Sequence, residues 1–164
     1  MRACGTGIGA AALAAVFAVA GCSREEPPPY NLTNNMQFVM QHVLDPAADV
    51  VWGASGYVIT EEGEQDLSPK TVEEWERVET GAGTVAEIGN LLMTPGRAPE
   101  GEADWLKHAQ AMTAAALKAQ KAAETQNKEV VFDYGGEMYQ ACLACHEQYV
   151  TGEANATVNA EGGS

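Results

Sequence analysis

The chain has 164 residues, with 23 acidic against nine basic ones, so its formal charge at neutral pH is −14. This length suits one domain with a hydrophobic core of its own. A surface this acidic argues against nucleic acids and anionic lipid surfaces as partners, and it either favours a basic protein as partner or only keeps the protein soluble.

Residues 1–21 have the pattern of a secretory signal peptide. One basic residue, Arg2, precedes a run of small apolar residues that ends at Ala20 and is too short for a permanent membrane span. The run closes with Val19-Ala20-Gly21-Cys22. This sequence is similar to a bacterial lipobox, in which the cysteine receives lipid and becomes the mature N-terminus. An ordinary signal peptide cleaved nearby, or a buried apolar helix, is the alternative.

Two segments without a core are expected to flank the domain. Residues 22–30 are acidic and proline-rich, so they predict an extended linker that holds the domain away from the membrane. Residues 151–164 are small and polar, which predicts a disordered tail. By resemblance to lipoproteins, Ser23 after the lipidated Cys22 favours the outer membrane. We therefore expect a lipid-anchored protein on the periplasmic face of a bacterial membrane, preferably the outer one.

Hydrophobic spacing predicts four amphipathic helices within residues 31–150, and therefore an all-α, antiparallel four-helix bundle. In the first segment the apolar side chains recur at steps of three and four: Leu32, Met36, Val39, Met40, Val43, Ala47, Val50, Val51 and Ala54. Asp45-Pro46 interrupts this stripe. Aspartate suits a helix N-cap and proline the first helical position, so we expect the segment to kink or restart there.

A long loop is expected to separate the first helix from the other three. Residues 53–69 are rich in glycine and acid, with a short extended stretch predicted at 57–60. The second helix begins near Thr71, and its inward stripe is Val72, Trp75, Val78, Ala82, Val85, Ile88 and Leu92. The third helix covers residues 102–126, with an inward stripe of Trp105, Ala109, Met112, Ala116 and Ala119.

The fourth helix carries the segment with the clearest chemistry, Cys142-Leu143-Ala144-Cys145-His146. Two thiols at this spacing can each add to a vinyl group of haem, and the histidine that follows becomes an iron ligand. Both cysteines fall on the apolar stripe of the helix, together with Val131, Tyr134, Met138 and Tyr149. A redox-active Cys-x-x-Cys would need a βαβ setting. Zinc would need four ligands, and only His42 and His108 remain to complete the set.

The cysteine count agrees with one covalent haem c and one lipid anchor. Cys4 leaves with the signal peptide, Cys22 takes lipid, and Cys142 with Cys145 take the haem. No free thiol and no disulfide are then expected in the mature chain. Loss of Arg2 with the signal peptide leaves eight basic and 23 acidic residues, a formal charge of −15.

The order of these features resembles the cytochrome c′ family, whose members are four-helix bundles with Cys-x-x-Cys-His near the C-terminus. The resemblance covers residues 31–150 in layout, and its specific part is Cys142 to His146 followed by Tyr149. The segments 43–52 and 90–93 also resemble a branch of this family found as envelope lipoproteins. Many members have a basic residue four places after the haem histidine, where this chain has Val150. The resemblance therefore does not imply a positive charge on the proximal side of the haem in this chain. The resemblance further implies pairing of two copies through their first helices.

The resemblance implies that the first helix supplies the distal side of the haem. Family members have there either an apolar side chain, which leaves the iron five-coordinate, or a methionine that ligates it. Met40, one turn after Met36 on the inward stripe, is the candidate sixth ligand, and ordinary core packing is the alternative for both methionines. His42 lies on the opposite side of the helix from Met40, and His108 is a weaker inward-facing candidate.

Two functions follow from the two distal arrangements. Iron held by His146 and Met40 suits one-electron transfer to a basic redox protein of the envelope. An open distal side, walled by Met36, Val39 and Met40, would instead bind NO or CO. The sequence assigns no distal His and Arg pair that would cleave a peroxide bond, so we expect a carrier or ligand-binding protein rather than an enzyme.

Overall fold

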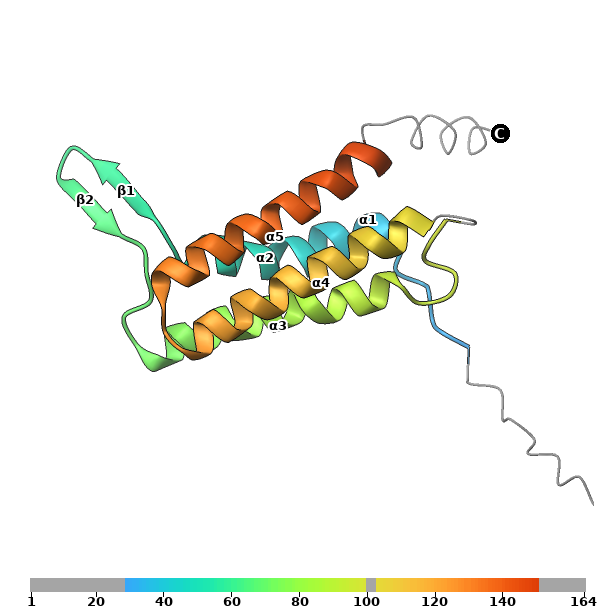
Figure 1. The fold of residues 1–164 in the computed structure, drawn as a ribbon, viewed down its shortest axis with the longest axis horizontal. Helices are drawn as coiled ribbons and strands as arrows, with labels where there is room; N and C mark the ends of the chain where they lie inside the picture. The colour runs from blue at the N-terminus through green and yellow to red at the C-terminus, as the bar shows by residue number, and fades with distance from the viewer. Residues whose placement is uncertain (1–28, 100–102, 151–164) are drawn as a thin grey trace, which may run out of the picture.

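The computed structural model describes residues 29–99 and 103–150, which form a mostly helical domain with one β-hairpin (Figure 1). The elements in chain order are α1 (Met36–Val39), η1 (Met40–Leu44), α2 (Asp45–Trp52), β1 (Tyr57–Thr60), β2 (Gly63–Asp66), α3 (Val72–Leu92), α4 (Ala103–Glu124) and α5 (Lys128–Tyr149). The first three helical segments follow one another without a break and form one rod, called here the first rod (residues 36–52). The prediction of a mainly helical fold is therefore confirmed.

Several predictions concern parts of the chain outside the described residues. These are the signal peptide (1–21), the lipidated Cys22 with most of the linker (22–30), and the tail (151–164). Among the described residues, no helix combines the length and the apolarity that crossing a membrane requires. Export and anchoring of the chain therefore stay predictions.

Helix packing places the core between α3, α4 and their neighbours. α4 packs along both α3 and α5, the first rod packs along α3, and α5 touches α2 only lightly. Two indole N–H groups tie the layers together, because Trp105 donates to the carbonyl of Leu92 at 2.8 Å and Trp52 donates to that of Gly135 at 3.0 Å. The largest fully buried side chains are Val51, Val85, Val131 and Met138.

The first rod does not restart at Asp45 but widens into a π-helical turn, η1. The N–H of Asp45 donates to the carbonyl of Met40, five residues earlier, and Asp45 has ordinary helical angles instead of those of an N-cap. The predicted N-cap was therefore wrong. Pro46 explains the wide turn, because it has no N–H to donate and its ring would press on the carbonyl four residues before it in a regular α-helix.

The extra residue in the π turn shifts the inward face of the rod by one position. Leu44 and Ala48 are buried, at 6% and 0% exposure, whereas the predicted Val43 and Val50 are exposed at 37% and 39%. The regular spacing of three and four assumed an unbroken α-helix. The predicted stripe was consequently correct for Val39, Val51 and Ala54, which are buried, and wrong for Leu32, Val43 and Val50, which are exposed.

The start of α3 and most of the inward positions of α3 and α4 are as predicted. Thr71 caps α3, since its hydroxyl accepts from the N–H of Glu74 at 3.2 Å and its own N–H donates to the Glu74 carboxylate at 3.1 Å. Val72, the first residue of α3, is exposed, in contrast to the prediction. All the other predicted inward residues are buried: Trp75, Val78, Ala82, Val85, Ile88, Leu92, Trp105, Ala109, Met112, Ala116 and Ala119.

The segment predicted as a loop, residues 53–69, contains the β-hairpin. β1 has the bounds of the predicted extended stretch and pairs antiparallel with β2, with Tyr57 opposite Asp66 and Thr60 opposite Gly63. Strand β2 was not predicted, because its sequence Gly-Glu-Gln-Asp has no apolar residue to alternate with the polar ones. Gly63 has a φ of 128°, a conformation that favours glycine.

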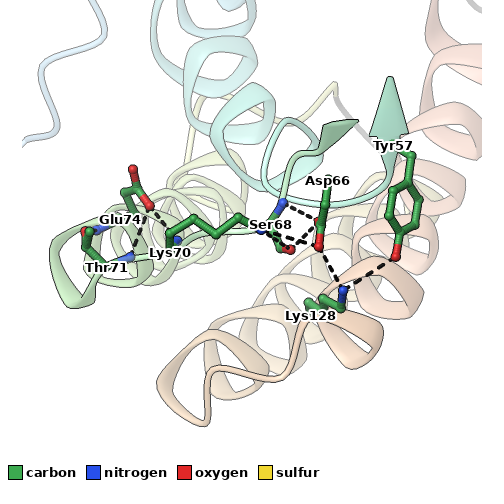
Figure 2. Close-up of polar contacts among 7 residues, drawn as sticks. All are labelled: Tyr57, Asp66, Ser68, Lys70, Thr71, Glu74 and Lys128. Carbon is green, nitrogen blue, oxygen red and sulfur yellow. Dashed lines mark hydrogen bonds and ion pairs between the residues drawn. The ribbon is translucent and has the colours of Figure 1, made fainter. Parts of the chain in front are cut away.

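Lys128, the first residue of α5, fastens the hairpin to the helices (Figure 2). Its Nζ lies 2.9 Å from Oδ2 of Asp66 and 3.5 Å from the hydroxyl oxygen of Tyr57. Ser68 donates its hydroxyl and its backbone N–H to Oδ1 of the same carboxylate. The Ser68 donors, followed by the Lys128 ammonium, hold the pKa of Asp66 well below its usual range.

Gly81 marks a close approach of α3 to the first rod. A Cβ atom at this position would lie 2.9 Å from the carbonyl oxygen of Ala47 and 3.0 Å from the Cβ of Val50. Because backbone would have to shift, we expect Gly81→Ala to lower the free energy of unfolding by about 1–3 kcal/mol. Urea unfolding measures this change.

Gly136→Ala is the matched control, because a Cβ atom at this exposed position of α5 would have no neighbour within 4 Å. This variant should gain up to about 1 kcal/mol from helix propensity. Opposite signs are thus expected for the same substitution in two helices. A Gly81→Ala protein as stable as the Gly136→Ala protein would contradict the tight packing of α3 on the first rod.

Candidate functional site

The Cys-x-x-Cys-His motif lies in the last turns of α5, at the end of the domain opposite the hairpin (Figure 1). Cys142 and Cys145 carry free thiols and are half-buried, one helical turn apart on one face. His146 is exposed. The predicted common face of the two cysteines is therefore present, but it lies at the edge of the core and not within it.

A cavity of about 20 Å³ joins this motif to residues from the first rod, α3 and α4. Its lining is formed by Met40, Leu44, Leu92, His108, Ala109, Met112, Ala141, Cys142, Cys145 and His146. The fold thus brings the predicted Met40 to the same cavity as all three motif residues. Apart from Met40, the three motif residues and His108, the lining side chains are those of leucine, alanine and methionine.

The other predicted distal residues do not line the cavity. Met36 is half-buried and Val39 is buried, and neither is part of the lining. Leu44 takes the place beside Met40 because η1 has turned it inward. His42 is exposed and its ring lies next to Phe38, with 4.8 Å between ring centroids, and it does not line the cavity.

His108 lies on the α4 wall and contacts the end of α5. Its Nε2 is 2.8 Å from Oε1 of Gln148, and its ring meets the edge of Tyr149 at a centroid distance of 6.0 Å. Tyr149 also packs edge-on against Trp105, at 5.1 Å. These contacts fasten the end of α5 to α4, whereas η1 meets the motif across the cavity.

The electrostatic setting keeps both thiols protonated at neutral pH. Burial, and then the neighbouring Cys145, raises the pKa of Cys142 to about 11, and burial also raises the pKa of Cys145. The motif lies near the C-terminal, negative end of α5, which does not favour a thiolate. Redox-active Cys-x-x-Cys pairs instead use helix N-termini or cations to lower a thiol pKa. The site therefore does not fit thiol-disulfide chemistry.

This raised pKa predicts slow alkylation of Cys142 in protein made without haem. In a Cys145→Ser apoprotein at pH 8, iodoacetamide should react with Cys142 about tenfold or more slowly than with an exposed cysteine of pKa about 8.5, because burial, the larger cause of the raised pKa, remains in this variant. The rate should continue to increase well above about pH 8.5, because the thiolate fraction still increases there. Alkylation rates measured from pH 7 to 11 test this. A rate that is already maximal at pH 7 would indicate an activated thiol and contradict the description.

The side chains at the cavity suit a metal ion that is held mainly by a cofactor and takes only one or two ligands from the protein. Within residues 29–99 and 103–150, no three His, Cys, Asp or Glu side chains are grouped so that they could hold a metal ion by themselves. Haem iron needs only axial ligands from a protein, and an imidazole with a thioether is one such pair. Two thiols one helical turn apart on the same face could hold the porphyrin, so the residues present fit haem c.

Comparisons with known proteins identify no relative of this chain. Searches of protein-family models, of curated proteins and of solved structures each find nothing that matches the chain. The resemblance to the cytochrome c′ family therefore depends on the motif and the helix layout. What the site can do is argued below from its own residues.

Proposed function

We propose that this protein is a c-type haem protein of the bacterial envelope that carries single electrons. The observation that carries the proposal is the shared cavity, where Met40 meets Cys142, Cys145 and His146. In this proposal the two cysteines form thioethers with the haem, His146 is the proximal iron ligand and Met40 the sixth. Bound haem supplies an iron that alternates between the ferrous and ferric states, and a His/Met ligand pair raises its reduction potential.

Haem binding requires the walls of the cavity to separate. A volume of about 20 Å³ holds roughly one water molecule, far less than a porphyrin. His108 and Trp105 hold the end of α5 on α4, whereas α5 packs only lightly on α2. We therefore expect α5 to move away from the first rod when haem is attached, because that interface has the least packing to lose.

The helix arrangement supports a cytochrome c′-like bundle. The first rod, α3, α4 and α5 would be its four helices, with the haem on the last one. Val43, exposed on the first rod, offers apolar surface for the predicted pairing of two copies. The hairpin is an addition at the opposite end of the domain.

Lipidation of Cys22 would place this domain on the periplasmic side of the membrane, preferably the outer membrane. We expect Cys22→Ala to release the protein into the soluble fraction, because the lipid is the proposed anchor. Fractionation of cells followed by immunoblotting measures the change. A variant that still sediments with membranes would contradict lipid anchoring at this residue.

The negative charge of the chain supports a basic redox protein of the envelope as the electron-transfer partner. The formal charge of −15 on the mature chain attracts a basic partner, and dissolved salt screens this attraction. Electron transfer between the two should consequently slow as salt is added.

Gas binding is the second candidate, and the apolar walls of the cavity favour it. Leu44, Leu92 and Met112 line the cavity beside Met40 and would surround a diatomic ligand with apolar groups. If Met40 does not ligate the iron, NO or CO could bind there. The absorption spectrum of the ferrous protein decides between the two. A low-spin spectrum that CO leaves unchanged supports the electron carrier, and a high-spin spectrum that CO alters supports gas binding.

A further inference from the structure

Arg97, in the connection between α3 and α4, differs from every other described cation. The described part of the chain contains seven lysines and arginines. Six of them form an ion pair with a carboxylate: Lys70, Arg77, Lys107, Lys118, Lys121 and Lys128. Arg97 has no such pair among the described residues, although the protein has a large excess of acid.

The guanidinium of Arg97 is only partly satisfied. Its Nη1 donates to the carbonyl oxygen of Asn34 at 2.8 Å, while its buried Nε has no hydrogen-bond partner in the described structure. The guanidinium as a whole is half-buried, and a buried donor atom without a partner is unfavourable. Because the planar guanidinium matches a carboxylate with two parallel hydrogen bonds, an anionic ligand would complete this site.

Arg97 lies at the cavity end of the domain. It follows Leu92, which lines the cavity, by five residues, and Asn34 precedes Met40 by six. Figure 1 shows the start of α1, the end of α3 and the end of α5 at this same end. The turn that presents Arg97 includes Gly96 at a φ of 86° and a bond from the Arg97 N–H to the carbonyl of Thr94 at 3.1 Å. Arg97 therefore links the chain before the first rod to the chain after α3.

We propose that Arg97 binds a propionate carboxylate of the haem and ties it to the chain around Asn34. This inference rests on the proposed function, because the haem supplies the carboxylate. Haem has two propionates, and the residues that line the cavity include no arginine or lysine. The cation would balance the propionate charge and thereby favour the ferrous state, in which the iron carries one positive charge less.

Arg97→Gln removes the cation and should lower the reduction potential, because an unbalanced propionate favours ferric iron. Arg77→Gln is the matched control, since it removes the same charge from an exposed side chain that pairs with Glu74 on α3. Solvent and salt screen that distant charge. Potentiometric titration of the holoprotein measures both. Equal potentials in the two variants would overturn the proposal.

Arg97→Lys separates ligand binding from a purely structural role. It keeps the charge, so the potential should stay close to that of the wild type. A single ammonium replaces the two-pronged guanidinium, so the propionate bending band in the resonance Raman spectrum should shift. A band at the wild-type position would overturn the proposal even if the glutamine variant does not fold. Absence of haem from the wild-type protein would be a different result, because it would overturn the proposed function itself.

Discussion

Met40→Ala is expected to convert a low-spin, six-coordinate haem into a high-spin, five-coordinate haem that binds CO. The reason is that Met40 lines the same cavity as His146. An alanine methyl cannot ligate iron, so the sixth position becomes free for a diatomic ligand. Absorption spectra of the ferrous protein with and without CO should change from no detectable binding to one CO per haem.

Met112→Ala is the control for this variant. Met112 is buried in α4 and lines the same cavity, so its replacement removes a thioether of the same size from the same place. Both variants lose packing, which costs about 2–5 kcal/mol for the buried Met112 and less for the half-buried Met40. Only Met40→Ala should change the spin state. A spectrum that stays low-spin without Met40 would identify Met40 as a core residue and favour another sixth ligand.

The double variant Cys142→Ala, Cys145→Ala is expected to lose covalently bound haem completely. Each thiol supplies one thioether, so a single variant retains one bond and the double variant retains none. Haem staining after denaturing electrophoresis, together with the mass of the intact chain, measures the loss. The helical content should stay near that of the wild type, because the buried residues Val85, Ala116 and Val131 do not line the cavity.

Leu143→Ala is the control within the motif. Leu143 is exposed between the two cysteines, and its replacement leaves both thiols and His146 in place. This variant should therefore keep its haem. Pigment that remains attached to the double cysteine variant after denaturation would show that other residues form the covalent link.

The helices could be predicted from the sequence because they follow a regular repeat. The inward stripe of α4 was predicted correctly from Trp105 to Ala119, since one side of an unbroken helix faces the core over its whole length. The first rod is not a regular α-helix near Pro46. The π turn there puts Leu44 and Ala48 inside in place of the residues one position earlier. Strand β2 was missed for a different reason, because it is stabilised by pairing with β1 and not by an apolar face of its own.

From the residues alone, only the part of the candidate site that is contiguous in the sequence could be predicted. Cys142, Cys145 and His146 form a motif that can be read without a structure. The placement of Met40 beside them was predicted from a family resemblance, and the cavity supports it. The place of Leu92 in the cavity wall and the unpaired Nε of Arg97 were not predictable, because both depend on how the end of α3 meets the start of the first rod. Such contacts join residues that are far apart in the sequence, so the spacing of residues within one helix does not predict them.

The most direct test of the central claim is the mass and absorption spectrum of the purified protein after denaturation. The protein should be made in a host with working cytochrome maturation. The account predicts one haem per chain that survives denaturation, together with no titratable thiol at Cys142 or Cys145. A colourless polypeptide with the mass of its amino acids and lipid alone, and with both thiols free, would contradict it.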